Sequence, residues 1–263
     1  MKRKHILSHI FIWISVAVAI FPIVFVFTHS FMDPGEIVSR YSPEILESNV
    51  GDFSSHNIHF VRFGLLPDQP TLEQYKQLLL ESPQYLRMFW NSVILVVPIL
   101  LGQCVIAPLA AYGFENIRWK YKEVIYFMYI IVMLMPTQIL LVPNFIVAGW
   151  LNIRDSYLAI ILPAMFHPLG VFLIRQQLKS FPKECMEAAA LDGAGAFQIY
   201  RQIVRPNLSS VVAALVVLLF ADNWNIIDQA VIFVTELYDN PLSVYLGSVA
   251  MEDPGMFFAV SVF

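Results

Sequence analysis

The chain has 263 residues, of which 58% are hydrophobic and only 14% are charged, with a formal net charge of -4. Ordinary soluble domains carry charged residues at about 25% of their positions, so this composition excludes a protein that is surrounded by water alone. Lipid must replace water around most of the chain, and we predict an integral membrane protein. The negative charge argues against a nucleic-acid partner, and two cysteines, Cys104 and Cys185, are too few for a disulfide framework or a cysteine metal site.

Apolar runs of about 20 residues mark candidate membrane-spanning helices. Five runs have this character, and the fifth is interrupted by polar residues: Leu7–Phe27, Phe89–Phe114, Val124–Ala148, Tyr157–Ile174 and Leu208–Val234. We therefore predict an all-α fold, a polytopic transmembrane helical bundle with five complete spans. Prolines inside several runs favour kinked helices around a pathway, because neighbouring helices in a membrane can satisfy the carbonyl groups that a proline frees.

A further apolar run, Phe257–Phe263, has only seven residues and is far too short to span a membrane. We expect it to be the start of a sixth helix, so that the chain is a fragment or comes from a truncated reading frame.

The basic residues alternate between the loops, which predicts the orientation. Eleven of the 16 fall on one side: Lys2, Arg3, Lys4, Arg118, Lys120, Lys122, Arg175, Lys179, Lys183, Arg201 and Arg205. By the positive-inside rule this side is cytoplasmic. We expect residues 1–27 to form a cytoplasmic N-terminus and the first transmembrane helix, and residues 28–88 to form an extracytoplasmic segment.

The extracytoplasmic segment contains a predicted helix, Thr71–Leu80. Its opening, Thr71-Leu72-Glu73-Gln74, has the spacing of a capping box, in which the first and fourth residues satisfy each other's backbone N–H groups. The segment is either a small cap over a membrane portal or a surface loop.

Polar residues interrupt the fifth run where lipid-exposed polar groups would be costly. The candidates for a substrate pathway are Asp222, Asn223, Trp224, Asn225, Asp228 and Gln229. Amides and carboxylates suit a solute rich in hydroxyl groups, and an indole offers a stacking face. The alternative is a polar contact between helices, which membrane bundles also use.

The loop between the fourth and fifth runs, Arg175–Arg205, is basic and predicts two short helices. Pro182 favours a helix start, so we predict a helix over Lys183–Leu191 that a left-handed Gly193 ends. A second helix over Ala196–Val204 is expected to end before Pro206. The short length and the alanine-rich side of the first helix favour docking to a protein over an interfacial helix on lipid headgroups.

These residues resemble a known family. Glu187-Ala188-Ala189, Asp192-Gly193-Ala194, Ile203 and Pro206 resemble the EAA loop of ATP-binding-cassette (ABC) importer permeases, except that Arg205 stands where the family usually has leucine. Together with Trp224-Asn225, the loop is similar to the carbohydrate-uptake branch, which includes the smaller maltose permease subunit. Ile226 and Ile227 depart from the branch's second motif, so the substrate can differ from the usual one.

The resemblance implies a permease domain over residues 71–263 with a truncated sixth helix, in the plasma membrane. It implies a second permease subunit that completes the pathway, a dimeric ABC ATPase that docks on the EAA loop, and an extracytoplasmic solute-binding protein that delivers a carbohydrate. The chain has no Gly-x-x-x-x-Gly-Lys-Ser/Thr loop. We therefore expect no enzyme activity and no cofactor in this chain, with ATP bound by the partner.

Other readings stay open. One is an ABC permease for a non-sugar solute, although an oxyanion path should show basic residues within spans. Others are an ion-coupled secondary transporter, which needs acids or broken helices in two halves, and a membrane scaffold without transport function. His56 and His59 lack further ligands for a metal site, and His167 is interpreted as a packing residue.

Overall fold

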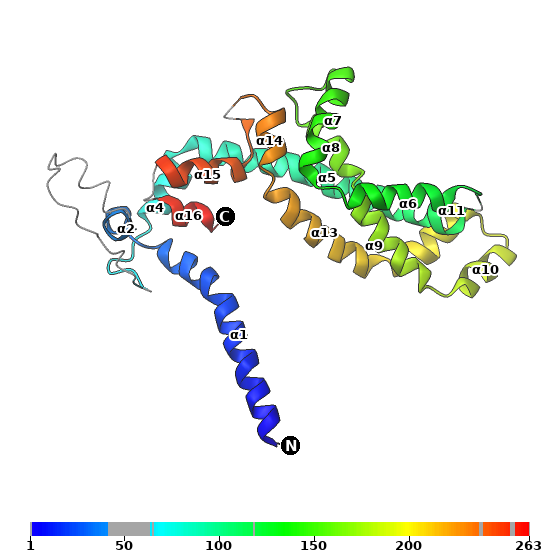
Figure 1. Cartoon of the computed structure of the whole chain (residues 1–263), viewed down its shortest axis with the longest axis horizontal. Coiled ribbons are helices and arrows are strands. Elements are labelled where there is room, and N and C mark those ends of the chain that lie inside the picture. The colour runs from blue at the N-terminus through cyan, green and yellow to red at the C-terminus, as the bar shows by residue number, and fades with distance from the viewer. Residues whose placement is uncertain are drawn as a thin grey trace. The chain divides into compact units, whose positions relative to one another are not determined.

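The computed structural model describes residues 2–41, 64, 66–117, 119–236, 239–252 and 256–262. The chain divides into two compact units (Figure 1): unit 1 is Met1–Arg87 with Tyr245–Phe263, and unit 2 is Met88–Val244. Over the described residues the secondary structure is helical, with an isolated β-bridge between Met32 and Pro70 and no β-strand. The predicted all-α class is confirmed for this part of the chain.

Unit 1 is built around the end of its long first helix. Its helices are α1 (Lys2–His29), α2 (Pro34–Tyr41), α4 (Glu73–Lys76), the π-helical turn η1 (Gln77–Glu81) and α16 (Phe257–Ser261). His29 is fully buried, its Nε2 lies 2.8 Å from the Tyr41 hydroxyl, and its ring lies 5.1 Å from that of Phe258. The short run expected to begin a sixth span thus forms α16, which packs against α1.

The predicted capping box at Thr71 is wrong. Thr71 Oγ1 accepts a hydrogen bond from the Glu73 N–H, and α4 begins at Glu73 after Leu72. The Gln74 side chain is buried instead, where it donates to the Met32 carbonyl and accepts from the Ala259 N–H at 3.3 Å. The hydrogen bonds that the Gln74 amide makes in the core of unit 1 therefore take the place of the one that it would make in a capping box.

Unit 2 contains most of the apolar helices. They are α5 (Pro83–Asn116), α6 (Lys122–Met133), α7 (Thr137–Trp150), α8 (Leu158–Met165), α9 (Pro168–Lys179), α10 (Lys183–Leu191), α11 (Ala196–Ile199), the π-helical turn η2 (Tyr200–Val204), α12 (Arg205–Asn207), α13 (Ser209–Trp224) and α14 (Asp228–Phe233). The start of α5 belongs to unit 1, and α15 (Leu242–Glu252) begins in unit 2 and lies mostly in unit 1.

Three helical stretches of the described residues are long and apolar enough to cross a membrane: Phe11–His29, Pro83–Asn116 and Leu158–Lys179. Two further stretches are sharply bent, α6 with α7 by 109° and α11–α12 with α13 by 70°. The structure thus supports three to five spans, and the count of five stays a prediction. The last bent stretch, residues 196–224, begins and ends earlier than the predicted run Leu208–Val234.

Two of the helix breaks have a proline at their origin. Pro136 precedes α7 with ψ 137°, and His167, which precedes Pro168, has ψ 131°. At His167 the ring of Pro168 disfavours the helical conformation, whereas at the other break Pro136 is itself extended; neither proline has an N–H to donate. Pro98 and Pro108, in contrast, lie inside α5 and do not end it.

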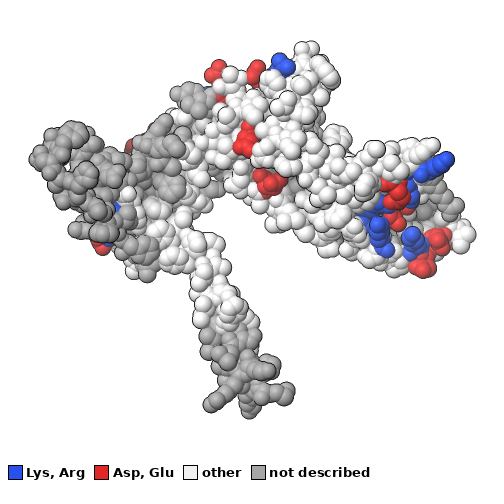
Figure 2. Space-filling model, viewed as in Figure 1, with Lys and Arg blue, Asp and Glu red and all other residues white. Residues whose placement is uncertain are grey.

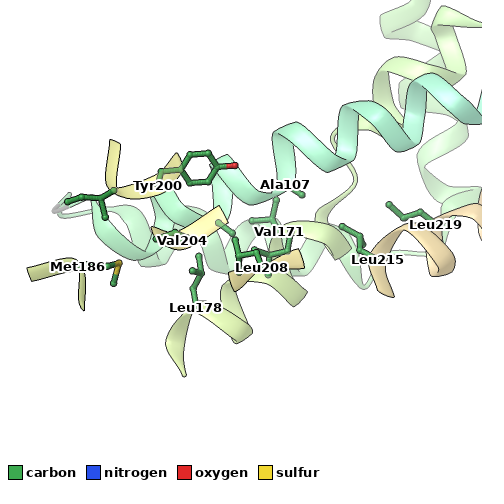
Figure 3. Close-up of a cluster of buried hydrophobic side chains, with 12 residues drawn as sticks. Ala107, Val171, Leu178, Met186, Tyr200, Val204, Leu208, Leu215 and Leu219 are labelled. Atoms are coloured by element: carbon green, nitrogen blue, oxygen red, sulfur yellow. The ribbon is translucent and has the colours of Figure 1, made fainter. Parts of the chain in front are cut away.

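One apolar core joins α5, α9 and α13 to the short helices α10 and α11 and to the turn η2 (Figure 3). It includes Ala107 of α5, Val171 of α9, Met186 of α10 and Leu215 of α13. Gly170 lets these helices approach closely, because an added Cβ would lie 2.5 Å from Gln103 Oε1 and 2.9 Å from Ala107 Cβ. Small residues serve this purpose widely in membrane helix packing.

We expect Gly170→Ala to destabilise the chain by about 1–3 kcal/mol, the usual cost of overpacking. The measurement is the melting temperature of the tagged chain in mild detergent, followed by size-exclusion chromatography with fluorescence detection. Gly113→Ala is the matched control, since its Cβ would meet only Ile117 Cδ1, at 3.6 Å. Equal melting temperatures for the two variants would contradict the close approach.

Candidate functional site

A cavity of about 490 Å³ lies in unit 2 where three helix breaks meet. The breaks separate α6 from α7, α8 from α9 and α13 from α14. The polar residues of the lining are Tyr129, Thr137, Asn144, His167, Asp222, Asn223, Asn225, Asp228 and Gln229. Irregular backbone at membrane depth is tolerated where it is buried in protein or lines a cavity, and binding sites of transporters use such discontinuous helices.

The break between α8 and α9 is held by side chains from other helices. The Gln103 amide of α5 donates to the carbonyl oxygens of Ala164, at 3.0 Å, and His167, at 3.1 Å. The Tyr129 hydroxyl of α6 donates to the Phe166 carbonyl at 2.7 Å. Three carbonyl groups at this break thus have donors, as the ends of helices require.

The break between α13 and α14 is held by side chains at the end of α13 itself and by one side chain from α15. Asn223 and Asn225 each donate to a carbonyl one turn earlier at 2.8 Å, and the Ser243 hydroxyl donates to the Ile226 carbonyl at 2.6 Å. Gln138, in the first turn of α7, donates to Asp228 Oδ2 at 3.0 Å. This last bond joins the starts of α7 and α14 across the cavity region.

Five of the six sequence-predicted pathway residues line the cavity: Asp222, Asn223, Asn225, Asp228 and Gln229. Trp224 lies elsewhere, because its ring packs at 5.2 Å on Phe220 and at 5.7 Å on Phe89. Their part in transport stays a prediction. Sequence reasoning missed Gln103, Tyr129, Thr137 and Asn144, although Gln103 and Asn144, as amides within apolar runs, gave a signal.

The chemistry of the lining is that of hydrogen bonding without positive charge. Amides and hydroxyls donate and accept, and the carboxylates of Asp222 and Asp228 accept. No lysine or arginine is among the described residues that line it. Nor do the described residues contain a group of three His, Cys, Asp or Glu that could hold a metal ion, and His56 and His59 lie outside them.

The loop after α9 forms a second candidate site. Helix α10 has the predicted bounds Lys183–Leu191, and Gly193 has the predicted left-handed conformation with φ 87°. Nothing lies within 4 Å of an added Cβ at Gly193, so its conformation rather than space requires glycine. The expected end before Pro206 is wrong: the helical turns continue through Asn207, and the irregular π-helical turn η2 directly precedes the segment that contains Pro206.

Met186 anchors α10 in the core, and most of the EAA-like residues lie outside it. Glu187, Ala188, Asp192, Gly193 and Pro206 are exposed, whereas Ala189, Ala194 and Ile203 are half-buried. The apolar Leu191 and Phe197 are also exposed, at 89% and 69%. In Figure 2, most of the visible Lys and Arg atoms of unit 2 gather at the end that carries α10.

A comparison with protein families shows to which family a chain with this cavity and this EAA-like loop belongs. The family model of the binding-protein-dependent transport system inner membrane component matches residues 103–263, which include both candidate sites. The chain belongs to this family. The resemblance of the Glu187–Ala194 and Ile203–Pro206 region to an importer permease is thereby confirmed.

Curated relatives and a solved structure agree with this membership. The sn-glycerol-3-phosphate transport system permease protein of Brucella abortus (strain 2308) is 26% identical over 227 residues, which cover 84% of this chain and 73% of that protein. The lactose transport system permease protein of Rhizobium radiobacter is 34% identical over 138 residues, 52% of this chain and 50% of that protein. A chain from a bacterial ABC transporter involved in the import of the acidic polysaccharide alginate has the same fold, with a TM-score of 0.78, 18% identity and coverage of 99% of this chain and 91% of that chain.

For this permease we expect Gln103→Leu to lower stability by about 1 kcal/mol, because two carbonyl groups at the α8–α9 break lose their donor. The readout is the melting temperature in mild detergent, with the neighbouring Cys104→Ala as control. A Gln103→Leu variant that melts like the wild type would show that other groups satisfy the break.

Proposed function

We propose that this permease forms one half of the translocation pathway for a neutral, hydroxyl-rich solute, a carbohydrate, in an ATP-driven importer. A second permease subunit supplies the other half, and an extracytoplasmic binding protein delivers the solute. The observation that carries the proposal is the cavity at the three helix breaks, whose lining offers amides, hydroxyls and carboxylates. Its volume of about 490 Å³ lies within the range of small-molecule sites.

The charge of the lining favours a neutral sugar over a phosphorylated one. The relatives named above include permeases for sn-glycerol-3-phosphate and for lactose. A phosphate group is usually held by arginine, lysine or a free helix N-terminus. Here Asp228 already occupies the first turn of α14, and the His167 ring accepts the Leu169 N–H at the start of α9. The carboxylates of Asp222 and Asp228 would repel an anion.

The EAA-like loop supports docking of a separate ATPase dimer on its exposed side. Glu187 offers a carboxylate to a basic partner, and the exposed Leu191 and Phe197 offer apolar contact. Such exposed apolar groups beside polar ones are typical of protein interfaces. With the loop on the cytoplasmic side, as the distribution of basic residues favours, the N-terminus is also cytoplasmic.

We expect Gln229→Leu to reduce carbohydrate uptake up to about tenfold, because one lost hydrogen bond costs about 1 kcal/mol and 1.4 kcal/mol is a factor of ten. The assay is uptake of radiolabelled neutral mono- and disaccharides by a host strain that lacks its own copy of the gene. Gln177→Leu, an exposed position on α9 outside the cavity, is the matched control. Competition by sn-glycerol-3-phosphate but not by neutral sugars would overturn the assignment of substrate class.

We expect Glu187→Lys to abolish recovery of the ATPase with the tagged permease from mild-detergent membranes, because it reverses the charge at the proposed contact. The recovered subunits are identified by mass spectrometry. Glu81→Lys, an exposed glutamate of η1 in unit 1, makes the same change away from the loop. An unchanged yield of ATPase with Glu187→Lys would remove Glu187 from the docking surface.

A further inference from the structure

A buried arginine joins three helices at the end of unit 2 that carries α10. The Arg175 side chain of α9 is only 3% exposed, and its Nη2 donates to Glu123 of α6 at 2.6 Å. Its Cζ lies 3.8 Å from the centre of the Tyr126 ring, which is a cation-π contact. Its Nε lies 3.4 Å from Glu115 Oε2 near the end of α5. None of these residues is part of the EAA-like motif.

The Glu115 carboxylate is shared between two cations and binds neither closely. While its Oε2 faces Arg175, its Oε1 lies 3.6 Å from Nζ of Lys183, the first residue of α10. Both distances exceed those of ordinary hydrogen bonds. Among the described residues, the buried Nε and Nη1 of Arg175 have no hydrogen-bond partner. A buried polar group left in this state requires an explanation.

A second arrangement of the same groups would satisfy the Nε group of the arginine. If α10 moved away and took Lys183 with it, the Glu115 carboxylate could close onto Nε of Arg175, while Nη2 stays bound to Glu123. A hydrogen bond between a guanidinium and a carboxylate is charge-assisted and about twice as strong as one between neutral groups. A carboxylate with two such positions, one shared and one closed on Arg175, is what a conformational switch needs.

Rigid helices connect this cluster to the cavity. Glu115 lies 12 residues along α5 from Gln103, which holds the carbonyl groups of the α8–α9 break. Arg175 lies eight residues along the chain from His167, which lines the cavity. At about 1.5 Å per helical residue, these separations are about 18 Å and 12 Å. A displacement of α5 relative to α9 at the cluster therefore reaches the break.

We propose that Glu115 is a positioning residue for transport: it passes from the shared to the closed arrangement when α10 is displaced, and thereby transmits the motion of α10 to α5 and α9. The inference rests on the proposed docking of an ATPase on the α10 loop. The exchange moves one carboxylate between two cations and leaves the summed charge of Glu115, Glu123, Arg175 and Lys183 at zero.

The test removes Lys183 without disturbing the rest of the cluster. Lys183→Met leaves Glu115 free to close on Arg175 permanently, so we expect uptake per ATP hydrolysed to fall by at least about fivefold, at the lower end of typical coupling effects. The melting temperature of the variant should equal or exceed that of the wild type, because Arg175 gains its partner. A merely structural ion pair would instead lower the melting temperature. Lys183→Arg should restore coupling.

The ATP hydrolysis rate is measured on the complex that is recovered with the tagged chain, and uptake of the radiolabelled neutral sugars is measured in the host strain. In a Glu115→Gln background, Lys183→Met should have no further effect on uptake per ATP. Lys120→Met is the matched control, since Lys120 is exposed and its Nζ lies by the Tyr121 ring rather than in the cluster.

Each contrary outcome has its own meaning. If Lys183→Met alone prevents recovery of the ATPase, Lys183 is a docking contact and the exchange of Glu115 is refuted. Normal coupling in Lys183→Met, or additive effects in the double variant, refute it as well. If the wild-type chain itself brings no ATPase, the proposed function fails and the inference fails with it.

Discussion

The need to satisfy every backbone polar group without water governs the described structure of unit 2. A break in a membrane helix frees carbonyl and N–H groups that lipid cannot bind. At the α8–α9 break, Gln103 and Tyr129 supply donors from α5 and α6, and at the α13–α14 break Asn225 and Ser243 donate to the carbonyl groups of Ala221 and Ile226. The cavity exists because these side chains allow three helices to stop beside one another.

Features that depend on neighbouring residues in the chain were predictable from the sequence. The apolar runs indicated where the long helices lie, the prolines inside them predicted kinks, and Pro182 with Gly193 set both ends of α10. Each of these signals acts through local backbone sterics, namely the fixed φ of proline and the left-handed freedom of glycine. The family motif around α10 was readable for the same reason.

Features that depend on distant partners were not predictable. Gln74 has the spacing of a capping residue, but its amide lies in the core of unit 1 beside Met32 and Ala259. Trp224 stands in a polar sequence, but it packs on Phe89, which is 135 positions away in the chain. The structural roles of Gln103 and Arg175 depend on carbonyl and carboxylate groups on other helices. The periodicity of a sequence indicates which face of a helix is apolar. It does not indicate which polar side chains of different helices contact each other.

The polar residues of α5 and α9 also explain how a small loop can influence a distant cavity. Apolar contacts between helices are nondirectional and permit sliding, whereas the Gln103 amide fixes the start of α9 to α5, and the looser Glu115–Arg175 ion pair joins the two helices further along. Gly170, between them, brings the helices close enough for side chains to interlock. Because close-packed interfaces adopt discrete arrangements rather than deforming continuously, a change at the Glu115 end must be accommodated at the Gln103 end, where the helix break lines the cavity.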